Sequence, residues 1–309
     1  MDNSYKELLL ELGKVLKSEN IKLNEEMKNY TTFKVGGPCD IMIFPTNEEE
    51  FINSIKEILK SKVPYFILGL GSNLLVKDGG IRGVVVNITK FNEIKVKGNV
   101  LKAKCGAKLK DVSNIAYENS LEGMCFACGI PGTIGGAITM NAGAYGGEIS
   151  EVIKSVRVID KEGNVLTINK DEMEFGYRST IVMKKGYMVI DCELQLEFGD
   201  KEKIKEKIDD LTLKRETKQP LECASAGSTF KRPEGYFVGK LIEDLGLRGY
   251  THKNAMISEK HCGFVINKSN ATAEEILELI DIIKKKVYDK FKVQLELEVR
   301  VIGEDKREI

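Results

Sequence analysis

The stretch Gly129-Ile-Pro-Gly-Thr-Ile-Gly-Gly-Ala-Ile-Thr-Met-Asn-Ala-Gly-Ala-Tyr-Gly-Gly147 contains seven glycines and differs sharply from the charged sequence around it. Glycine weakens helices and strands, so a dense run is tolerated mainly where the backbone takes positive φ values or a ligand touches the main chain. Successive amide groups in such a turn can form a concave site for an anion. The stretch therefore predicts a ligand-binding turn.

A second glycine turn, Leu68-Gly-Leu-Gly-Ser-Asn-Leu-Leu75, follows the apolar run that begins at Tyr65, and its Ser72 and Asn73 add side-chain donors. Two such turns indicate one long ligand that carries phosphate. Neither turn fits a Rossmann fingerprint, because Gly69-Leu-Gly71 lacks a third glycine before a helix and no acidic residue follows at the usual distance. A Walker lysine is also missing. The two turns predict a nucleotide or dinucleotide in an unconventional site.

Composition narrows the class of protein. A chain of 309 residues is expected to form two or three domains. Lys and Arg together number 47, as do Asp and Glu, so the charge pattern of a general nucleic-acid binder is not expected. The N-terminal region has too short an apolar run for a signal peptide, and no run approaches the length of a membrane span. The seven scattered cysteines indicate reduced thiols, and hence the cytoplasm.

Periodicity and capping residues predict an α+β fold. Thr46-x-x-Glu49 and Thr272-x-x-Glu275 are capping boxes that would open two of the helices. The expected helices cover residues 4–17, 46–59, 109–117, 201–218, 237–245 and 272–291. The expected strands cover residues 41–44, 65–68, 83–88, 100–105, 156–159, 165–168, 188–198, 263–266 and 293–302. A nucleotide-binding region would thus be followed by antiparallel sheet and then by a further α+β unit.

Several short motifs follow one another over nearly the whole chain: Asn29-Tyr-Thr-Thr-Phe-Lys-Val-Gly-Gly37, Gly69-Leu-Gly-Ser-Asn-Leu-Leu75, Gly129-Ile-Pro-Gly-Thr-Ile-Gly-Gly136 with Asn141-Ala-Gly143, Tyr177-Arg-Ser179, Gly227-Ser-Thr-Phe-Lys231 and Glu298-Val-Arg300. In these motifs and in their order the chain resembles the UDP-N-acetylenolpyruvoylglucosamine reductase family. The segment between Arg178 and the strand at Met188 is short. The chain therefore resembles the subtype that lacks an extra tyrosine-bearing loop.

The resemblance implies a PCMH-type FAD-binding fold of two α/β subdomains, followed by a C-terminal α+β substrate domain. The expected boundaries are residues 1–32 for an N-terminal helix and lead-in, 33–197 for the FAD-binding domain and 198–309 for the substrate domain. The implied enzyme is a cytoplasmic, monomeric oxidoreductase that uses FAD and NADPH and no metal. It reduces the enolpyruvyl ether of UDP-N-acetylglucosamine to UDP-N-acetylmuramate for peptidoglycan synthesis, and needs neither a nucleic acid nor a membrane as partner.

The resemblance also assigns three catalytic residues. Hydride delivery to the enolpyruvyl ether leaves negative charge on the α-carbon and its carboxylate, and Arg178 would stabilise that charge through two N–H groups. Ser228 would donate the proton that completes the reduction. Glu298 matches the family's catalytic glutamate; since a bare carboxylate would repel the intermediate, it is expected to be protonated or to orient Arg178 or a water molecule. Read alone, these residues could equally be a surface arginine, a turn serine and a solvent-facing glutamate.

The two glycine turns supply the expected FAD contacts: Gly69, Gly71, Ser72, Asn73, Gly132, Thr133, Gly135 and Gly136. Tyr177 and Arg232 are the expected substrate-binding residues, although Tyr177 could equally be a core tyrosine. Many relatives have an asparagine where this chain has Arg232, so a charged contact would replace an amide contact there.

Two features have competing explanations. Cys125-Phe-Ala-Cys128 has the spacing of a redox or metal pair, but no second pair accompanies it, so buried structural thiols are favoured. His261 is either near the substrate or a hydrogen-bonded histidine at a strand edge.

The sequence leaves two rival functions open. A PCMH-type oxidase of an alcohol or sugar would need a different base, and a silent nucleotide sensor would not need Arg178, Ser228 and Glu298.

Overall fold

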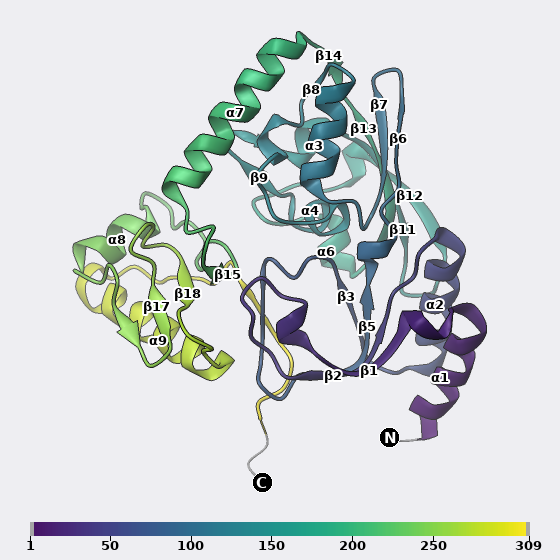
Figure 1. Ribbon diagram of the computed structural model, residues 1–309, viewed down its shortest axis with the longest axis horizontal. Coiled ribbons are helices and arrows are strands. Elements are labelled where there is room, and N and C mark those ends of the chain that lie inside the picture. Colours follow the sequence, from purple (N-terminus) through teal and green to yellow (C-terminus); the bar gives the residue numbers. More distant parts are fainter. Residues whose placement is uncertain (1–2, 307–309) are drawn as a thin grey trace. The chain divides into compact units, whose positions relative to one another are not determined.

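The computed structural model describes residues 3–306, which divide into two compact units (Figure 1). The first unit takes the chain up to Lys22 together with Ile41–Gly69 and Gly83–Arg215. The second takes Leu23–Asp40, Leu70–Arg82 and the chain from Glu216 onward. Each unit is therefore assembled from segments that lie far apart in the sequence.

A five-stranded antiparallel sheet is the centre of the first unit, with the strand order β12-β11-β13-β7-β6. Its strands are β6 (Ile94–Lys97), β7 (Val100–Lys104), β11 (Ile153–Ile159), β12 (Val165–Asn169) and β13 (Met188–Gln195). The predictions at 100–105, 156–159 and 165–168 are confirmed. The strand predicted over 188–198 ends at Gln195, and a short strand, β14 (Glu197–Phe198), pairs instead with β8 (Leu121–Glu122). Strand β6 was not predicted.

A second sheet has the order β1-β2-β5-β3. Its strands are β1 (Ile21–Glu26), β2 (Pro38–Ile43), β3 (Tyr65–Leu68) and β5 (Ile81–Asn87). β3 and β5 are parallel, with Tyr65 opposite Val84. Because parallel strands are covered on both faces, β5 is almost entirely buried and lacks the alternation of a half-exposed strand. The expected strands at 41–44, 65–68 and 83–88 are thus confirmed.

Helix α2 (Glu48–Ser61) begins one residue later than its predicted capping box. Asn47 is the N-cap and its Oδ1 accepts the amide of Glu50 at 2.9 Å. Glu50, not Glu49, returns its carboxylate to the amide of Thr46 at 2.8 Å. Asparagine caps a helix as well as threonine does, so moving the capping box by one position does not weaken the helix. Helix α1 (Asn3–Val15) packs against α2.

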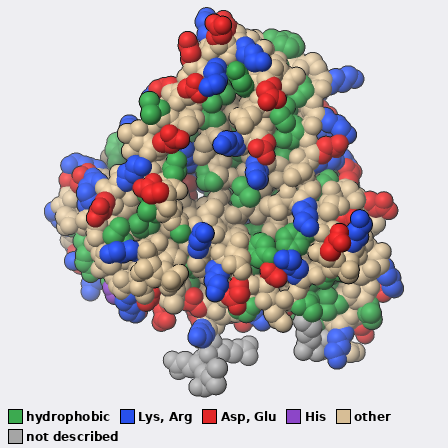
Figure 2. Space-filling model, viewed as in Figure 1, with side chains coloured by type: hydrophobic (Ala, Val, Ile, Leu, Met, Phe, Trp, Pro, Cys, Tyr) green, Lys and Arg blue, Asp and Glu red, His purple; other side chains and the backbone are tan. Residues whose placement is uncertain are grey.

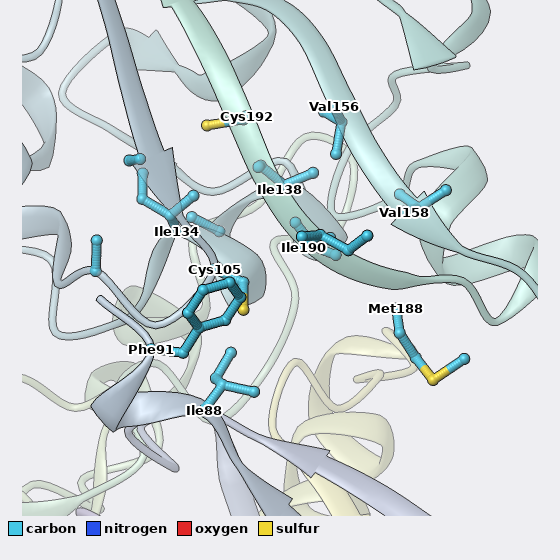
Figure 3. Packing of buried hydrophobic residues seen from close by; sticks show 14 of the residues in the cluster. Ile88, Phe91, Cys105, Ile134, Ile138, Val156, Val158, Met188, Ile190 and Cys192 are labelled. Atoms are coloured by element: carbon cyan, nitrogen blue, oxygen red, sulfur yellow. The ribbon is translucent and has the colours of Figure 1, made fainter. Parts of the chain in front are cut away.

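The main core lies between the five-stranded sheet and short helices. Figure 3 shows Ile134 and Ile138 of α4 (Ile134–Met140) beside Ile190 of β13 and Val156 of β11. Further helices of this unit are α3 (Leu109–Glu118), α5 (Ile149–Val152) and α6 (Ile181–Lys185), and it also contains the hairpin β9 (Gly143–Ala144) and β10 (Gly147–Glu148). α4 contacts both β7 and β13, so the turn that precedes it is anchored on the sheet.

Three charged side chains lie on adjacent strands of the same sheet, and a fourth reaches them from α2. Asp191 of β13 lies directly opposite Lys104 on one neighbouring strand and Arg157 on the other. Its Oδ2 atom is 2.7 Å from Lys104 Nζ and 2.9 Å from Arg157 Nη1. Glu48, at the start of α2, contacts the same two cations. Hydrogen bonds from Arg157 and Lys104 outweigh the effect of burial and lower the pKa of the Glu48 carboxyl to about 2.

The second unit combines two small sheets with two helices. The antiparallel sheet has the order β15-β18-β17-β16, and a parallel pair joins β4 to β19. The elements are β4 (Leu74–Val76), β15 (Ala224–Ser225), α8 (Val238–Asp244), β16 (Thr251–His252), β17 (Ala255–Ile257), β18 (Val265–Asn267), α9 (Ala273–Phe291) and β19 (Arg300–Ile302). The capping box at Thr272 and Glu275 is confirmed. The long strand predicted over 293–302 is wrong, because its partner β4 is only three residues long and pairs with Arg300–Ile302 alone.

The charged helix α7 (Lys201–Lys218) is confirmed over its predicted range. Its Ile204 and Leu211 pack on Cys125 and Cys128, whose Sγ atoms lie 4.0 and 3.9 Å from carbonyl oxygens of the helix. All seven cysteines are free thiols, and burial raises the pKa of Cys125. The Cys-x-x-Cys pair thus packs a helix against the turn before α4. Among residues 3–306 no group of three or more His, Cys, Asp and Glu side chains is arranged to hold a metal ion.

Charged side chains of both signs are interspersed over the face shown in Figure 2. The described helices include none that is both long enough and apolar enough to cross a membrane.

Candidate functional site

The two glycine turns meet within the first unit. A Cβ atom on Gly69 would lie 2.5 Å from Oγ1 of Thr133, so a side chain at position 69 would displace the threonine that begins the second turn. The sequence predicted that both turns bind one ligand. This contact places Gly69 of the first turn beside Thr133 of the second.

Gly71 is fixed by a second close approach, within the other unit. Its φ is +63°, and a Cβ atom there would lie 2.3 Å from the carbonyl oxygen of Tyr30. Its own carbonyl accepts the amide of Thr32 at 3.3 Å. Both the backbone angle and the lack of space require glycine at this position.

The second turn is bonded onto the sheet beneath it. Thr133 is the N-cap of α4, and its Oγ1 accepts the amide of Gly136 at 3.4 Å. The amide of Gly135 donates to the carbonyl of Cys105 at 2.8 Å, and a Cβ on Gly135 would be 3.0 Å from Cys105 Cβ. The carbonyl of Gly132 accepts the amide of Leu109 at 3.0 Å. Gly135 is therefore required by packing, while its expected contact with FAD stays a prediction.

Arg178 occupies a strained turn of the first unit. Gly176 and Ser179 exchange two backbone hydrogen bonds, of 3.0 and 3.2 Å, so Tyr177 and Arg178 are the two residues of a tight hairpin. Arg178 has a φ of +54°, a conformation that costs a non-glycine residue roughly 1 kcal/mol or more. Such strain persists where surrounding contacts impose it, which is a feature of functional sites.

Ser228 and Glu298 are neighbours within the second unit, brought together by Thr229. The amide of Glu298 donates to the Thr229 carbonyl at 3.0 Å. Thr229 is buried and makes two more hydrogen bonds, from its amide to the Gly263 carbonyl at 2.9 Å and from the Val265 amide to its Oγ1 at 3.0 Å. Ser228, one residue earlier, is exposed. Hydrogen bonds of Thr229 therefore fix the backbone on which the exposed Ser228 and the half-buried Glu298 lie.

Asn73 of the first glycine turn belongs to the same group. Its Nδ2 donates to the carbonyl of Glu298 at 3.1 Å, and its own carbonyl accepts the amide of Arg300 at 3.1 Å. The sequence suggested Asn73 only as a contact for FAD. In the structure this asparagine also fixes the segment that carries Glu298.

The two expected substrate-binding residues, Tyr177 and Arg232, lie on the surface. Tyr177 lies beside a guanidinium and Arg232 lies beside an aromatic ring. The Tyr177 side chain is 59 % exposed, which excludes a core role, and the Arg178 Cζ atom lies 5.1 Å from its ring centroid. The Arg232 Cζ atom stacks 4.0 Å above the ring of the exposed Phe237. A stacked guanidinium keeps its charge and its edge N–H groups available for an anion.

His261 is a hydrogen-bonded histidine. Its Nδ1 accepts the amide of Gly263 at 3.0 Å, and its ring meets Phe264 edge-on. Burial lowers the pKa of the imidazole, so the ring is neutral with its proton on Nε2. The structure thus supports the structural explanation for this residue.

Comparison with known proteins identifies the family of the chain. Residues 219–302 match the family described as UDP-N-acetylenolpyruvoylglucosamine reductase, C-terminal domain, and residues 38–169 match an FAD binding domain. The UDP-N-acetylenolpyruvoylglucosamine reductase of Clostridium perfringens (strain SM101 / Type A) is 56 % identical over 98 % of this chain and 100 % of its own length. The chain belongs to the UDP-N-acetylenolpyruvoylglucosamine reductase family. The family enzyme of Clostridioides difficile (strain 630) is 50 % identical over 97 % of this chain and 99 % of its own.

Solved structures agree with the membership of this reductase family. The crystal structure of the Thermus caldophilus enzyme, at 33 % identity, has a TM-score of 0.78 and covers 92 % of this chain and 98 % of its own. The pollen protein Phl p 4.0202, a glucose dehydrogenase, has a TM-score of 0.50 at 16 % identity over 63 % of this chain and 44 % of its own, which shows a shared fold alone. The predicted α+β class with a PCMH-type FAD-binding domain is confirmed. The boundaries at 32/33 and 197/198 stay predictions.

Three residues of this reductase were not singled out from the sequence: Thr229, Asn141 and Glu148. Thr229 follows the expected proton donor, and its importance comes from three hydrogen bonds that no local pattern indicates. Glu148 follows directly after the glycine-rich stretch, and Asn141 lies inside it. In the sequence, the available signal was an asparagine inside a glycine-rich turn with an acidic residue just beyond that turn.

Proposed function

We propose that this chain reduces UDP-N-acetylglucosamine-enolpyruvate to UDP-N-acetylmuramate, with Arg178, Ser228 and Glu298 as its catalytic residues. The hydrogen bond from the Glu298 amide to the Thr229 carbonyl carries the proposal, because it joins the segment that carries Ser228 to the segment that carries Glu298, although the two are far apart in the sequence. Membership in the reductase family supports the same reaction. The proposal includes a cytoplasmic location and a monomeric enzyme.

The residues of the glycine turns suit a large, flat, phosphate-bearing group. Thr133 Oγ1 and the Tyr30 carbonyl fill the space beside Gly69 and Gly71, so only glycine lets the first turn take its observed course. FAD would be held by these two glycines, Ser72 and Asn73, together with Gly132, Thr133, Gly135 and Gly136. The residues that hold FAD would thereby gain its redox chemistry, the transfer of a hydride from NADPH to the enolpyruvyl carbon.

The protein's own groups would bind and protonate the substrate. Arg178 would grip the carboxylate of the enolpyruvyl group and stabilise the negative charge that develops on it. Ser228 would hold its hydroxyl proton at the carbon that must be protonated. Glu298 would orient the arginine or a water molecule, and Tyr177 and Arg232 would contact the remainder of the sugar nucleotide.

The test is a pair of half-reactions on the purified protein. A yellow protein whose colour fades with NADPH and returns on addition of UDP-N-acetylglucosamine-enolpyruvate would support the proposal. Rapid return of colour in air without that substrate would indicate an oxidase. A colourless protein that binds nucleotide would indicate a sensor, and either result would contradict the proposed reaction.

Gly71→Ala is expected to weaken FAD binding by about tenfold or more, because its Cβ would collide with the Tyr30 carbonyl and displace the turn that carries Ser72 and Asn73. The measurement is a titration of apoprotein with FAD, followed by flavin fluorescence. Gly98→Ala is the control, since Gly98 has nearly the same φ, +62°, but nothing within 4 Å of its would-be Cβ. Equal FAD affinity in the two variants would show that Gly71 is not part of the flavin site.

A further inference from the structure

Two side-chain hydrogen bonds attach the hairpin that carries Arg178 to α4. Asn141 Nδ2 donates to the carbonyl of Gly176, the first residue of the hairpin, at 3.3 Å. Just beyond the hairpin, Thr180 Oγ1 donates to the carbonyl of Thr139 at 3.0 Å. Both contacts lead to the C-terminal end of α4, so the strained Arg178 backbone is tied to the helix that follows the second glycine turn.

Both polar atoms of the Asn141 side chain make hydrogen bonds. Asn141 is 1 % exposed, has a φ of +44° and is the C-cap of α4. Its Oδ1 accepts the amide of Ser150 at 3.0 Å, and its Nδ2 also donates to Glu148 Oε1 at 3.0 Å. The hydroxyl of Ser150 donates to the same carboxylate oxygen. The β9–β10 hairpin reverses the chain direction, and Glu148 accepts hydrogen bonds from both Asn141 and Ser150.

Asn141 holds Glu148 near the arginine hairpin, because its Nδ2 donates both to Glu148 Oε1 and to the Gly176 carbonyl. Hydrogen bonds from Ser150 and Asn141 lower the pKa of the Glu148 carboxyl, burial opposes them, and the positive charge of Arg178 lowers it further. Glu148 is therefore ionised at neutral pH, and its negative charge lies close enough to Arg178 to interact with it. One asparagine consequently positions both the backbone of the arginine hairpin and a counter-ion for its side chain.

We propose that Glu148 is a positioning residue for Arg178: held by Asn141 and Ser150, it orients the guanidinium before the substrate carboxylate arrives. An arginine side chain has large rotamer freedom, so ordering it in advance lowers the cost of forming a bidentate contact during the reaction. Glu148 would not touch the substrate. The inference rests on the role proposed for Arg178.

The test is Glu148→Gln in the holoenzyme, because glutamine keeps the Oε1 acceptor and removes the charge. Reoxidation of the reduced enzyme by UDP-N-acetylglucosamine-enolpyruvate is expected to slow by about tenfold or more, while reduction by NADPH stays within about twofold. The thermal midpoint should change little. Glu148→Asp, which restores the charge, should recover part of the rate. Glu151→Gln, at an exposed position nearby, should match the wild type.

Each alternative outcome has a distinct meaning. If Glu148→Gln lowers the thermal midpoint and slows both half-reactions equally, Glu148 is merely structural and the inference fails. If Glu148→Gln behaves as wild type while Arg178→Lys reoxidises slowly, the inference fails but the role of Arg178 stands. If Arg178→Lys also reoxidises at the wild-type rate, the proposed catalytic arginine itself is wrong.

Discussion

Ser228→Ala is expected to slow reoxidation of the reduced enzyme by UDP-N-acetylglucosamine-enolpyruvate by roughly 10²–10⁴-fold, while NADPH still reduces the flavin within about twofold of the wild-type rate. The reason is that alanine removes the proposed proton source but leaves the backbone in place. The backbone at this point is fixed by the three hydrogen bonds of Thr229, none of which involves the serine hydroxyl. Stopped-flow absorbance of the flavin measures the two half-reactions separately.

Two further variants separate loss of the proton from loss of structure. Ser269→Ala removes an exposed hydroxyl from the same unit, one that donates to Asn254, and should leave both half-reactions unchanged. Ser228→Cys provides another acidic hydrogen and should recover part of the reoxidation rate. Near-normal reoxidation by Ser228→Ala would refute the assignment of Ser228 as proton donor.

Local sequence patterns predicted only part of the candidate site. Gly69 and Gly71 were identified because glycine density has a direct backbone meaning, and the structure adds the atoms they would strike, Thr133 Oγ1 and the Tyr30 carbonyl. Ser228 and Glu298 were assigned only through resemblance to the family. Their adjacency depends on hydrogen bonds of Thr229, which connect segments about 70 residues apart, and no periodicity records such a contact.

The fold was predictable to a similar extent. The helices α7 and α9 followed from spacing and, for α9, from a capping box, since these signals lie within one element. The strand predicted over 293–302 was wrong because strand length is set by the partner, here the three residues of β4. Local patterns also could not indicate that residues 23–40 and 70–82 join the second unit, since that assignment depends on packing between distant segments.

Asp191 is the clearest case of a residue whose importance only the structure reveals. In the sequence it is one carboxylate among many, but it is 1 % exposed and lies opposite Lys104 and Arg157 on both neighbouring strands. A shift of one residue in either pairing would put Asp191 and the cation of that neighbouring strand on opposite faces of the sheet. The cluster therefore favours a single register of β7, β13 and β11, the strands against which α4 and its glycine turn pack.

Asp191→Asn is expected to lower the free energy of unfolding of the first unit by about 3 kcal/mol, because two cations then share Glu48 alone. At about 2–4 °C per kcal/mol, the thermal midpoint should fall by roughly 6–12 °C, measured by circular dichroism on the apoprotein. Asp209→Asn, in an exposed pair with Lys205 on α7, makes the same chemical change and should cost less than about 1 kcal/mol. Comparable losses in the two variants would mean that the charges of the sheet add no stability beyond an ordinary surface pair. A large loss at Asp191 alone would show that this buried carboxylate stabilises the sheet on which the proposed flavin turn and the Arg178 hairpin depend.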